Sequence, residues 1–250
     1  MNRDIALILL VASAIAAQAL RFDVASVRAL PGHPQIAAGI EVHPVSVRMS
    51  GFPLGAIIRW AYGLHPYQQG FEISGPSWLE PGLGCVWYDV EGKTEQPVSA
   101  EQLRSMVRTL LADRFNLSLH RERRDMTVCA ISIAKNGSKL RPSEEKEMRV
   151  SPEGETLHFR GATLSRPDEW LYAVVPYLIQ DETGLTGHYD FDLNYQRYME
   201  AYATPGPGGR IDGTAAINKA LEAIGLRADL KRRSVEILAI DHVEKVPTAN

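Results

Sequence analysis

Apolar residues recur at helical spacing in four segments of the chain. In the clearest segment, Leu103, Met106 and Leu110 follow one another at i, i+3 and i+7, so they share one face of a helix. Ser99 and Gln102 form a capping box at its start. The helix predicted at 214–226 stops at a glycine, the one at 52–63 starts at a proline, and the one at 165–175 starts at a Ser-x-x-Asp pattern. The four predicted helices are 99–115, 214–226, 52–63 and 165–175.

Strict alternation of apolar and polar residues predicts strands elsewhere. In "DETGLTGHYDFDL", Tyr189 and Phe191 alternate with His188, Asp190 and Asp192, which is typical of a half-buried strand. The two glycines before them suit a turn. An EF-hand calcium loop is excluded, because the alternate positions lack oxygen ligands. The other predicted strands are 127–135, 235–243, 88–93 and 71–75.

Two segments of the chain resemble each other at a fixed spacing. A shift of 109 positions (226 − 117 = 109) aligns Leu117 with Leu226 and Arg123-Arg124 with Arg232-Arg233, without a gap. Each copy contains a helix, a short connection, a basic strand or turn, and an apolar strand. We therefore predict an α+β fold, in which repeated helix–strand–strand units pack their helices on a mixed or antiparallel sheet. Coincidence among common αββ patterns is the alternative.

Charged and Gly/Pro-rich stretches suggest how the chain is divided. Residues 141–160 are charged and contain prolines and glycines, which predicts a connection with a possible edge hairpin. The predicted organisation is a signal peptide at 1–19, an N-terminal αβ lobe at 20–140, this connection, and a C-terminal αβ lobe at 161–250. Because each lobe carries one copy of the repeat, we expect the two lobes to share a sheet.

The N-terminus predicts export. An apolar run from Ile5 to Ala17 follows Arg3 and ends in a small-x-small pattern at Ala19. Thirteen residues are too few to cross a bilayer, which takes about 20. We expect cleavage after Ala19, a mature protein that starts at Leu20, a periplasmic or extracellular location, and no membrane span after cleavage. A buried first helix is the alternative.

Composition and charge narrow the class of protein. The chain has 250 residues, of which 45% are hydrophobic and 23% charged, with a net charge of −3. These values are typical of a globular protein and argue against a nucleic-acid partner. Cys85 and Cys129 form an even pair that an oxidising compartment would allow to bridge. A bridge and two free thiols both stay open.

No familiar catalytic or metal-binding spacing is present. His-x-x-His and HExxH patterns are absent from the sequence, so we expect no metal and no cofactor. The Ser-x-x-Lys pattern at Ser143 falls in a charged loop without the companion motifs of penicillin-binding enzymes. If the protein is an enzyme, its candidate residues are Asp181, Glu182, His188 and Asp190.

Seven ordered blocks resemble a known family. They are "FDVASVR", "IIRWAYGLHPYQ", "GPSWLE", "YDVEGK", "LRSMVRTLLADRFNLSLHRERRDMTVCAISIAKNGSKLRPS", "DETGLTGHYDFDL" and "ALEAIGLRADLKRRSVEILAIDHVEKVPTAN". They are similar to the soil-bacterial (acidobacterial, Solibacter-type) secreted family of unknown function. Related domains of that family occur fused to membrane metallopeptidases that resemble beta-lactam sensors. The resemblance implies an exported protein and supplies no catalytic residues. The chain departs from the family at "YAVVPYLIQ".

We therefore expect an exported, non-catalytic binding module for a protein, a glycan or a small ligand. Loops rich in Pro, Gly and aromatic residues suit recognition on a rigid frame. Residues 63–80 form such a loop, and Tyr67 and Trp78 are its candidate ligand-binding residues. His188 and Asp190 are two further candidates on the predicted strand. An extracytoplasmic enzyme with a site around residues 181–192 is the alternative.

Overall fold

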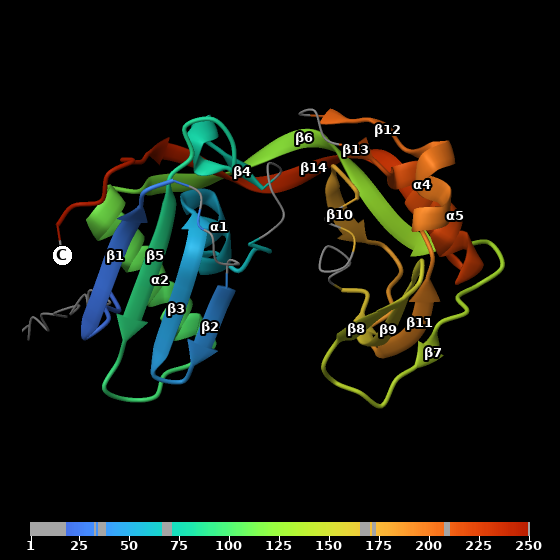
Figure 1. The fold of residues 1–250 in the computed structure, drawn as a ribbon, viewed down its shortest axis with the longest axis horizontal. Helices are drawn as coiled ribbons and strands as arrows, with labels where there is room; N and C mark the ends of the chain where they lie inside the picture. Colours follow the sequence, from blue (N-terminus) through green and yellow to red (C-terminus); the bar gives the residue numbers. More distant parts are fainter. Residues whose placement is uncertain are drawn as a thin grey trace, which may run out of the picture.

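The computed structural model describes the whole chain except residues 1–18, 33, 35–38, 67–71, 166–170, 172–173, 208–210 and 250. It contains both helices and sheets, so the predicted α+β class is confirmed, although strands predominate. Two groups of elements lie at opposite ends of a long two-stranded ribbon (Figure 1). We call these groups the first half and the second half, in chain order.

The first half is a four-stranded antiparallel sheet with two helices against it (Figure 1). The strand order is β1-β5-β3-β2. The 3-10 helix η1 (Ser77–Leu79) lies between β4 (Ile73–Ser74) and β5 (Trp87–Lys93) in the chain. The strands are β1 (Val24–Leu30), β2 (Gly39–His43), β3 (Ser46–Pro53) and β5 (Trp87–Lys93), and the helices are α1 (Leu54–Ala61) and α2 (Ala100–Phe115).

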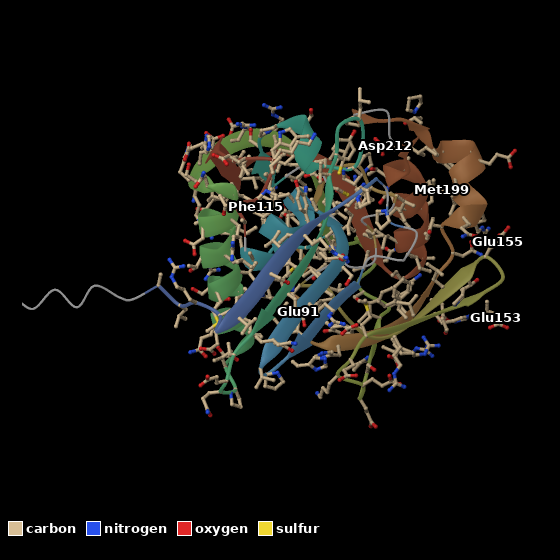
Figure 2. All side chains as sticks on the ribbon, turned by 60° about the vertical axis from the view of Figure 1, so that its left-hand side comes forward. Glu91, Phe115, Glu153, Glu155, Met199 and Asp212 are labelled. Carbon is tan, nitrogen blue, oxygen red and sulfur yellow. The ribbon has the colours of Figure 1, made fainter. Side chains whose placement is uncertain are left out.

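The second half has a four-stranded antiparallel sheet in the order β7-β11-β9-β8. The hairpin of β8 and β9 confirms the edge hairpin expected near residues 141–160. Glu153, at the end of β8, projects away from the sheet (Figure 2). The elements are β7 (Arg141–Pro142), β8 (Arg149–Glu153), β9 (Thr156–Thr163), β11 (His188–Leu193), α4 (Gln196–Tyr202), α5 (Thr214–Ala223), and the short pair β12 (Thr204–Pro205) and β13 (Ile211–Asp212).

The ribbon consists of β6 (Ser118–Ile133) and β14 (Leu226–His242), which pair antiparallel along nearly their whole length. A short parallel strand lies on each outer edge. These strands are β10 (Leu178–Asp181) beside β6 and β4 (Ile73–Ser74) beside β14. The ribbon is therefore the centre of a four-stranded sheet that both halves share (Figure 1).

The ribbon corrects one sequence prediction. We expected a basic strand or turn followed by a separate apolar strand in each helix–strand–strand unit. Instead, Arg123-Arg124 and Arg232-Arg233 lie inside continuous strands of 16 and 17 residues. The backbone pairing continues through the basic segments because their side chains project from the strands, and all four arginines are exposed. Each unit is thus a helix followed by one long strand.

Three apolar clusters stabilise this arrangement. The first lies between the sheet of the first half and helices α1 and α2 and includes Phe115 of α2 (Figure 2). The rings of Phe115 and Tyr88 meet edge-on, with 5.2 Å between their centroids. The second fills the second half around Phe159 and Phe191, whose rings stack at 4.8 Å. A third, smaller cluster on the ribbon and the adjacent β10 contains Val128, Leu178, Val235 and Ile237.

The end of the chain returns to the first half. The N–H of Glu244 donates to the carbonyl of Phe115 at 2.7 Å, and the hydroxyl of Tyr88 donates to the carbonyl of Lys245 at 2.6 Å. These contacts hold the C-terminal segment against α2 and β5. The lobe boundaries at 140 and 161 stay a prediction.

The local predictions had varied outcomes. The capping box of Ser99 and Gln102 is present at α2, and Gly225 follows α5 with a positive φ of 76°. Most of the helix predicted at 165–175 lies outside the described residues. Both thiols are free, with Cys129 buried and Cys85 half-buried. None of the described helices has the length and apolar character needed to cross a membrane.

Candidate functional site

The acidic turn at residues 181–187 is held together by its own contacts. Asp181 accepts hydrogen bonds from the N–H and hydroxyl of Thr183, at 2.8 and 2.6 Å, and so closes the turn. Glu182 pairs with Lys231 at 2.5 Å and with Arg233 at 2.8 Å on β14. The hydrogen bonds from Lys231 and Arg233 lower the pKa of Glu182. Both carboxylates therefore face protein partners rather than a shared cleft.

Asp190 stabilises a bulge between two strands. Its carboxylate accepts a hydrogen bond from the N–H of Gly161 at 3.0 Å, where the register of β9 and β11 shifts. Hydrogen bonds from Ser143 and Gly161 hold the pKa of Asp190 below its usual range. The carbonyl of His188 accepts a hydrogen bond from the N–H of Ser143 at 2.8 Å. The side chain of His188 is half-buried. These contacts explain both residues structurally, and their role in ligand binding stays a prediction.

His158 and Asp192 form a second polar pair that the sequence analysis did not single out. His158 Nδ1 lies 2.8 Å from Asp192 Oδ1, and Ser151 faces His158 on the neighbouring strand. His158 Nε2, however, lies 3.1 Å from Glu153 Oε2. A carboxylate thus takes the position that a catalytic serine would need. Among the described residues, no three His, Cys, Asp or Glu side chains are grouped so that they could hold a metal ion.

The structure describes one of the two residues of the predicted aromatic surface, whose role in ligand binding stays a prediction. Trp78 is half-buried and packs against the first apolar cluster, with Lys245 Nζ 5.9 Å from the centre of its ring. Tyr67 lies outside the described residues. Trp78 therefore contributes more to packing than a fully exposed recognition residue would.

The loop that carries Trp78 instead forms one wall of a pocket of about 360 Å³ beside β4. Its floor is apolar and comes from Leu79, Met126 and Ile237. Arg124 and Glu80 are the charged side chains that line it. Pockets for small molecules typically combine an apolar body of a few hundred Å³ with a few polar groups. Its remaining lining residues are Ile73, Ser74, Gly75, Pro76 and Ser77.

A buried ion pair supports the wall of this pocket. The guanidinium of Arg59 on α1 is fully buried and pairs with the carboxylate of Glu80, which is 24% exposed. Gly55 makes room for this contact, because a Cβ at that position would lie 2.9 Å from Glu80 Oε1. Burial lowers the pKa of Arg59 to about 10, although the nearby Glu72 opposes the effect.

This ion pair is incompletely hydrogen-bonded. Among the described residues, Arg59 Nε, Arg59 Nη1 and Glu80 Oε2 are buried without a hydrogen-bond partner. Burying charged groups in this way costs free energy, so such pairs are weak evidence for stability. A buried, perturbed charge next to a pocket is instead a common property of functional sites.

A family model described as "Protein of unknown function (DUF3738)" matches residues 55–243. The chain belongs to this family. The match covers α1, the pocket loop, the ribbon and the second half, so every residue that lines the pocket is part of the DUF3738 region. No curated protein and no solved structure matches the chain. The expectation of a family of unknown function is therefore confirmed.

Sequence reasoning identified the pocket loop and missed its charged partners. Residues 63–80 were singled out for their Pro, Gly and aromatic content, and 73–77, 79 and 80 line the pocket, whereas Trp78 does not. Arg59 lies in an apolar helix segment, and Arg124 was predicted only as part of a basic strand or turn. An arginine in "GAIIRWAYG", where the apolar stripe leaves no polar face, was the available signal.

Proposed function

We propose that this DUF3738 protein is an exported, non-catalytic binding module whose ligand enters the pocket beside β4. The observation that carries the proposal is the pocket itself, with its apolar floor, its two charged wall residues Arg124 and Glu80, and the buried Arg59 behind Glu80. Its volume of about 360 Å³ suits a small molecule. A small ligand is therefore favoured over a glycan chain or a protein surface.

The contacts of the acidic turn support binding over catalysis. Catalytic groups must lie within about 3 Å of one another or of the substrate. Asp181, Glu182 and Asp190 each contact a different structural partner. The alternative function, an enzyme with a site around residues 181–192, would require these contacts to break.

A thermal-shift screen of the mature protein with small molecules tests the binding site. Ser77 is exposed and lines the pocket, so Ser77→Trp would fill it with little effect on the fold. Ser234 is also exposed but lies on the opposite face of the ribbon from Ile237, which makes Ser234→Trp a matched control. We expect stabilising compounds to lose their effect in the first variant only. Compounds that act equally on both variants would place the site elsewhere.

Turnover would contradict the proposed class of function. If a compound found in the screen is converted to a product, and His188→Ala stops the conversion, the protein is an enzyme with a site around residues 181–192. We also infer export, and membership of the soil-bacterial secreted group, from the N-terminal sequence and the quoted blocks. Mass spectrometry of the protein from a bacterial host should give a mature N-terminus at Leu20, whereas an intact Met1 on cytoplasmic protein would refute export.

We further propose that the two halves are copies of one unit. The outer sheets support this, since β1-β5-β3-β2 and β7-β11-β9-β8 are both antiparallel and arrange their strands in the same order relative to the chain. In each half, the helix and the long ribbon strand follow the last strand of the outer sheet. In the ribbon, Asp125 pairs with Ser234, and the shift of 109 positions relates these same two residues (234 − 125 = 109). A crystal structure tests the proposal by superposition of residues 100–133 on 209–242. If Arg123-Arg124 and Arg232-Arg233 fail to coincide, the sequence alignment is accidental.

A further inference from the structure

The strand registers define which residues of the two halves occupy equivalent places. Ile73 pairs with Leu238 on β14, and Ile179 pairs with Cys129 on β6. Cys129 and Leu238 are equivalent in the ribbon (238 − 129 = 109), so Ile73 and Ile179 are equivalent as well. The spacing between β4 and β10 is therefore 106 positions (179 − 73 = 106). We call residues related in this way counterparts.

The counterparts around the pocket differ in one decisive respect. Arg124 corresponds to Arg233 (233 − 124 = 109), and Pro76 corresponds to Glu182 (182 − 76 = 106). In the second half, Arg233 donates to Glu182 Oε1 from Nη2 at 2.8 Å and from Nε at 3.3 Å. The chain itself thus supplies a carboxylate to the arginine of the ribbon.

In the first half, a proline stands at the position of that glutamate. Pro76 has neither a carboxylate nor an N–H, and β4 stops one residue earlier than β10 does (74 + 106 = 180). The pocket of about 360 Å³ lies at this place, and both Pro76 and Arg124 line it. In the first half, Arg124 therefore faces a pocket, whereas its counterpart Arg233 in the second half contacts a carboxylate.

We infer that the pocket binds a small molecule with a carboxylate on an apolar body. The carboxylate pairs with Arg124, as Glu182 pairs with Arg233, and the body lies on Leu79, Met126 and Ile237. A guanidinium recognises a carboxylate through two parallel hydrogen bonds, which are stronger than those of neutral groups. This inference rests on the proposed function and names its ligand class.

Glu122 does not satisfy the hydrogen-bonding capacity of Arg124. Arg124 Nη2 donates to Glu122 Oε1 at 2.5 Å, within the same strand. A guanidinium has five N–H donors in a fixed fork, so one such bond leaves others for a ligand. Glu122 is not part of the pocket lining, and the side chain of Arg124 is 51% exposed. An incoming carboxylate can therefore bind beside Glu122.

Methyl NMR with hexanoate and hexanamide tests the inference. The two probes share an apolar chain, and hexanoate alone carries a carboxylate. In mature protein labelled with ¹³C at the methionine methyl groups, Met126 reports on the pocket and Met199, on α4 in the second half (Figure 2), serves as a reference. We expect hexanoate to shift the Met126 signal at a concentration about tenfold lower than hexanamide, which corresponds to about 1.4 kcal/mol. The Met199 signal should not move.

Two arginine variants complete the test. Arg124→Gln should remove the tenfold preference for hexanoate, whereas its counterpart variant Arg233→Gln should keep it. If both probes shift Met126 equally in the wild-type protein, or if Arg124→Gln keeps the preference, the carboxylate inference is wrong while the pocket remains a binding site. If neither probe moves Met126 and compounds from the screen bind at the pocket, the ligand class is wrong. If screened compounds ignore Ser77→Trp as well, the proposed binding site fails with it.

Discussion

The two halves of the molecule share a contact in their outer sheets and differ where the short parallel strands meet the ribbon. Both have an outer antiparallel sheet with a bulge at a glycine of positive φ, Gly51 at 67° and Gly161 at 66°. In both, an aspartate on the neighbouring strand accepts from that glycine N–H at 3.0 Å, Asp89 in the first and Asp190 in the second. Contacts present in both halves build the fold, since a site for one ligand has no reason to occur twice.

The difference lies where the short parallel strands meet the ribbon. In the second half, Glu182 occupies this place and forms ion pairs with Lys231 and Arg233. The first half has a pocket there, backed by the buried pair of Arg59 and Glu80. Contacts that only one half makes are the better candidates for function, and each prediction below perturbs either a shared contact or a differing one.

Removal of Arg59 should have the largest effect. Arg59→Met takes away the fully buried partner of Glu80 and leaves its carboxylate without a counter-charge. Breaking a buried ion pair on one side costs about 3–5 kcal/mol. We expect the free energy of unfolding, measured with urea, to fall by about that amount.

The double variant Arg59→Met with Glu80→Gln provides the control. Because both charges are then removed, at least about half of the lost stability should return. A double variant as unstable as Arg59→Met would show that packing of the arginine, and not its charge, supports α1 and the pocket wall.

The two helix ends before the ribbon strands should respond unequally to exchange of their residues. Asn116 and Gly225 are counterparts with φ of 49° and 76°. A Cβ at Gly225 would lie 2.1 Å from the carbonyl oxygen of Gly137, whereas Asn116 already carries a side chain. We expect Gly225→Asn to lower the free energy of unfolding by about 3 kcal/mol and Asn116→Gly to change it by about 1 kcal/mol or less. Equal effects of the two substitutions in urea unfolding would mean that the loop at Gly137 moves to accommodate the new side chain.

Sequence periodicity predicted the elements whose pattern is local. The capping box at Ser99, the glycine at 225 and the strand from His188 are all present. The pattern failed where pairing partners decide the structure. The basic segments continue as strands because β6 and β14 pair with each other, and nothing in their own sequence shows that partner. The outer strands β1, β2 and β3 were missed for the same reason.

The candidate site was predictable in its loop and not in its charges. Composition pointed to residues 63–80, since Pro, Gly and aromatic residues are typical of binding loops. Arg59 and Glu80 are 21 positions apart, and Arg124 comes from a different element. Only the packing of α1 against the loop and the ribbon brings Glu80 and Arg124 to one pocket and places Arg59 behind Glu80. No spacing in the sequence reports such a contact.

The bulge aspartates should behave alike, since they make the same contact. Asp89→Ala and Asp190→Ala each remove the acceptor of a glycine N–H, and we expect both to lower the midpoint of thermal unfolding by similar amounts. Neither variant should change the shift of Met126 by hexanoate. If Asp190→Ala leaves the midpoint unchanged and abolishes binding, then Asp190 is the ligand residue that the sequence suggested.

The smallest effect should come from Glu182, and it should depend on pH. The side chains of Glu182, Lys231 and Arg233 are 30%, 31% and 42% exposed, so Glu182→Gln should cost about 1 kcal/mol or less at pH 7. Hydrogen bonds from Lys231 and Arg233 lower the pKa of Glu182 in the folded protein below its ordinary value of 4.5. The stabilisation is therefore fully present above pH 4.5 and is lost as the pH falls through the lowered value. Urea unfolding of both proteins from pH 7 to pH 3 should show the difference shrinking towards zero in acid. If the difference in the free energy of unfolding stays constant over this range, the charge of the Glu182 carboxylate does not stabilise the second half.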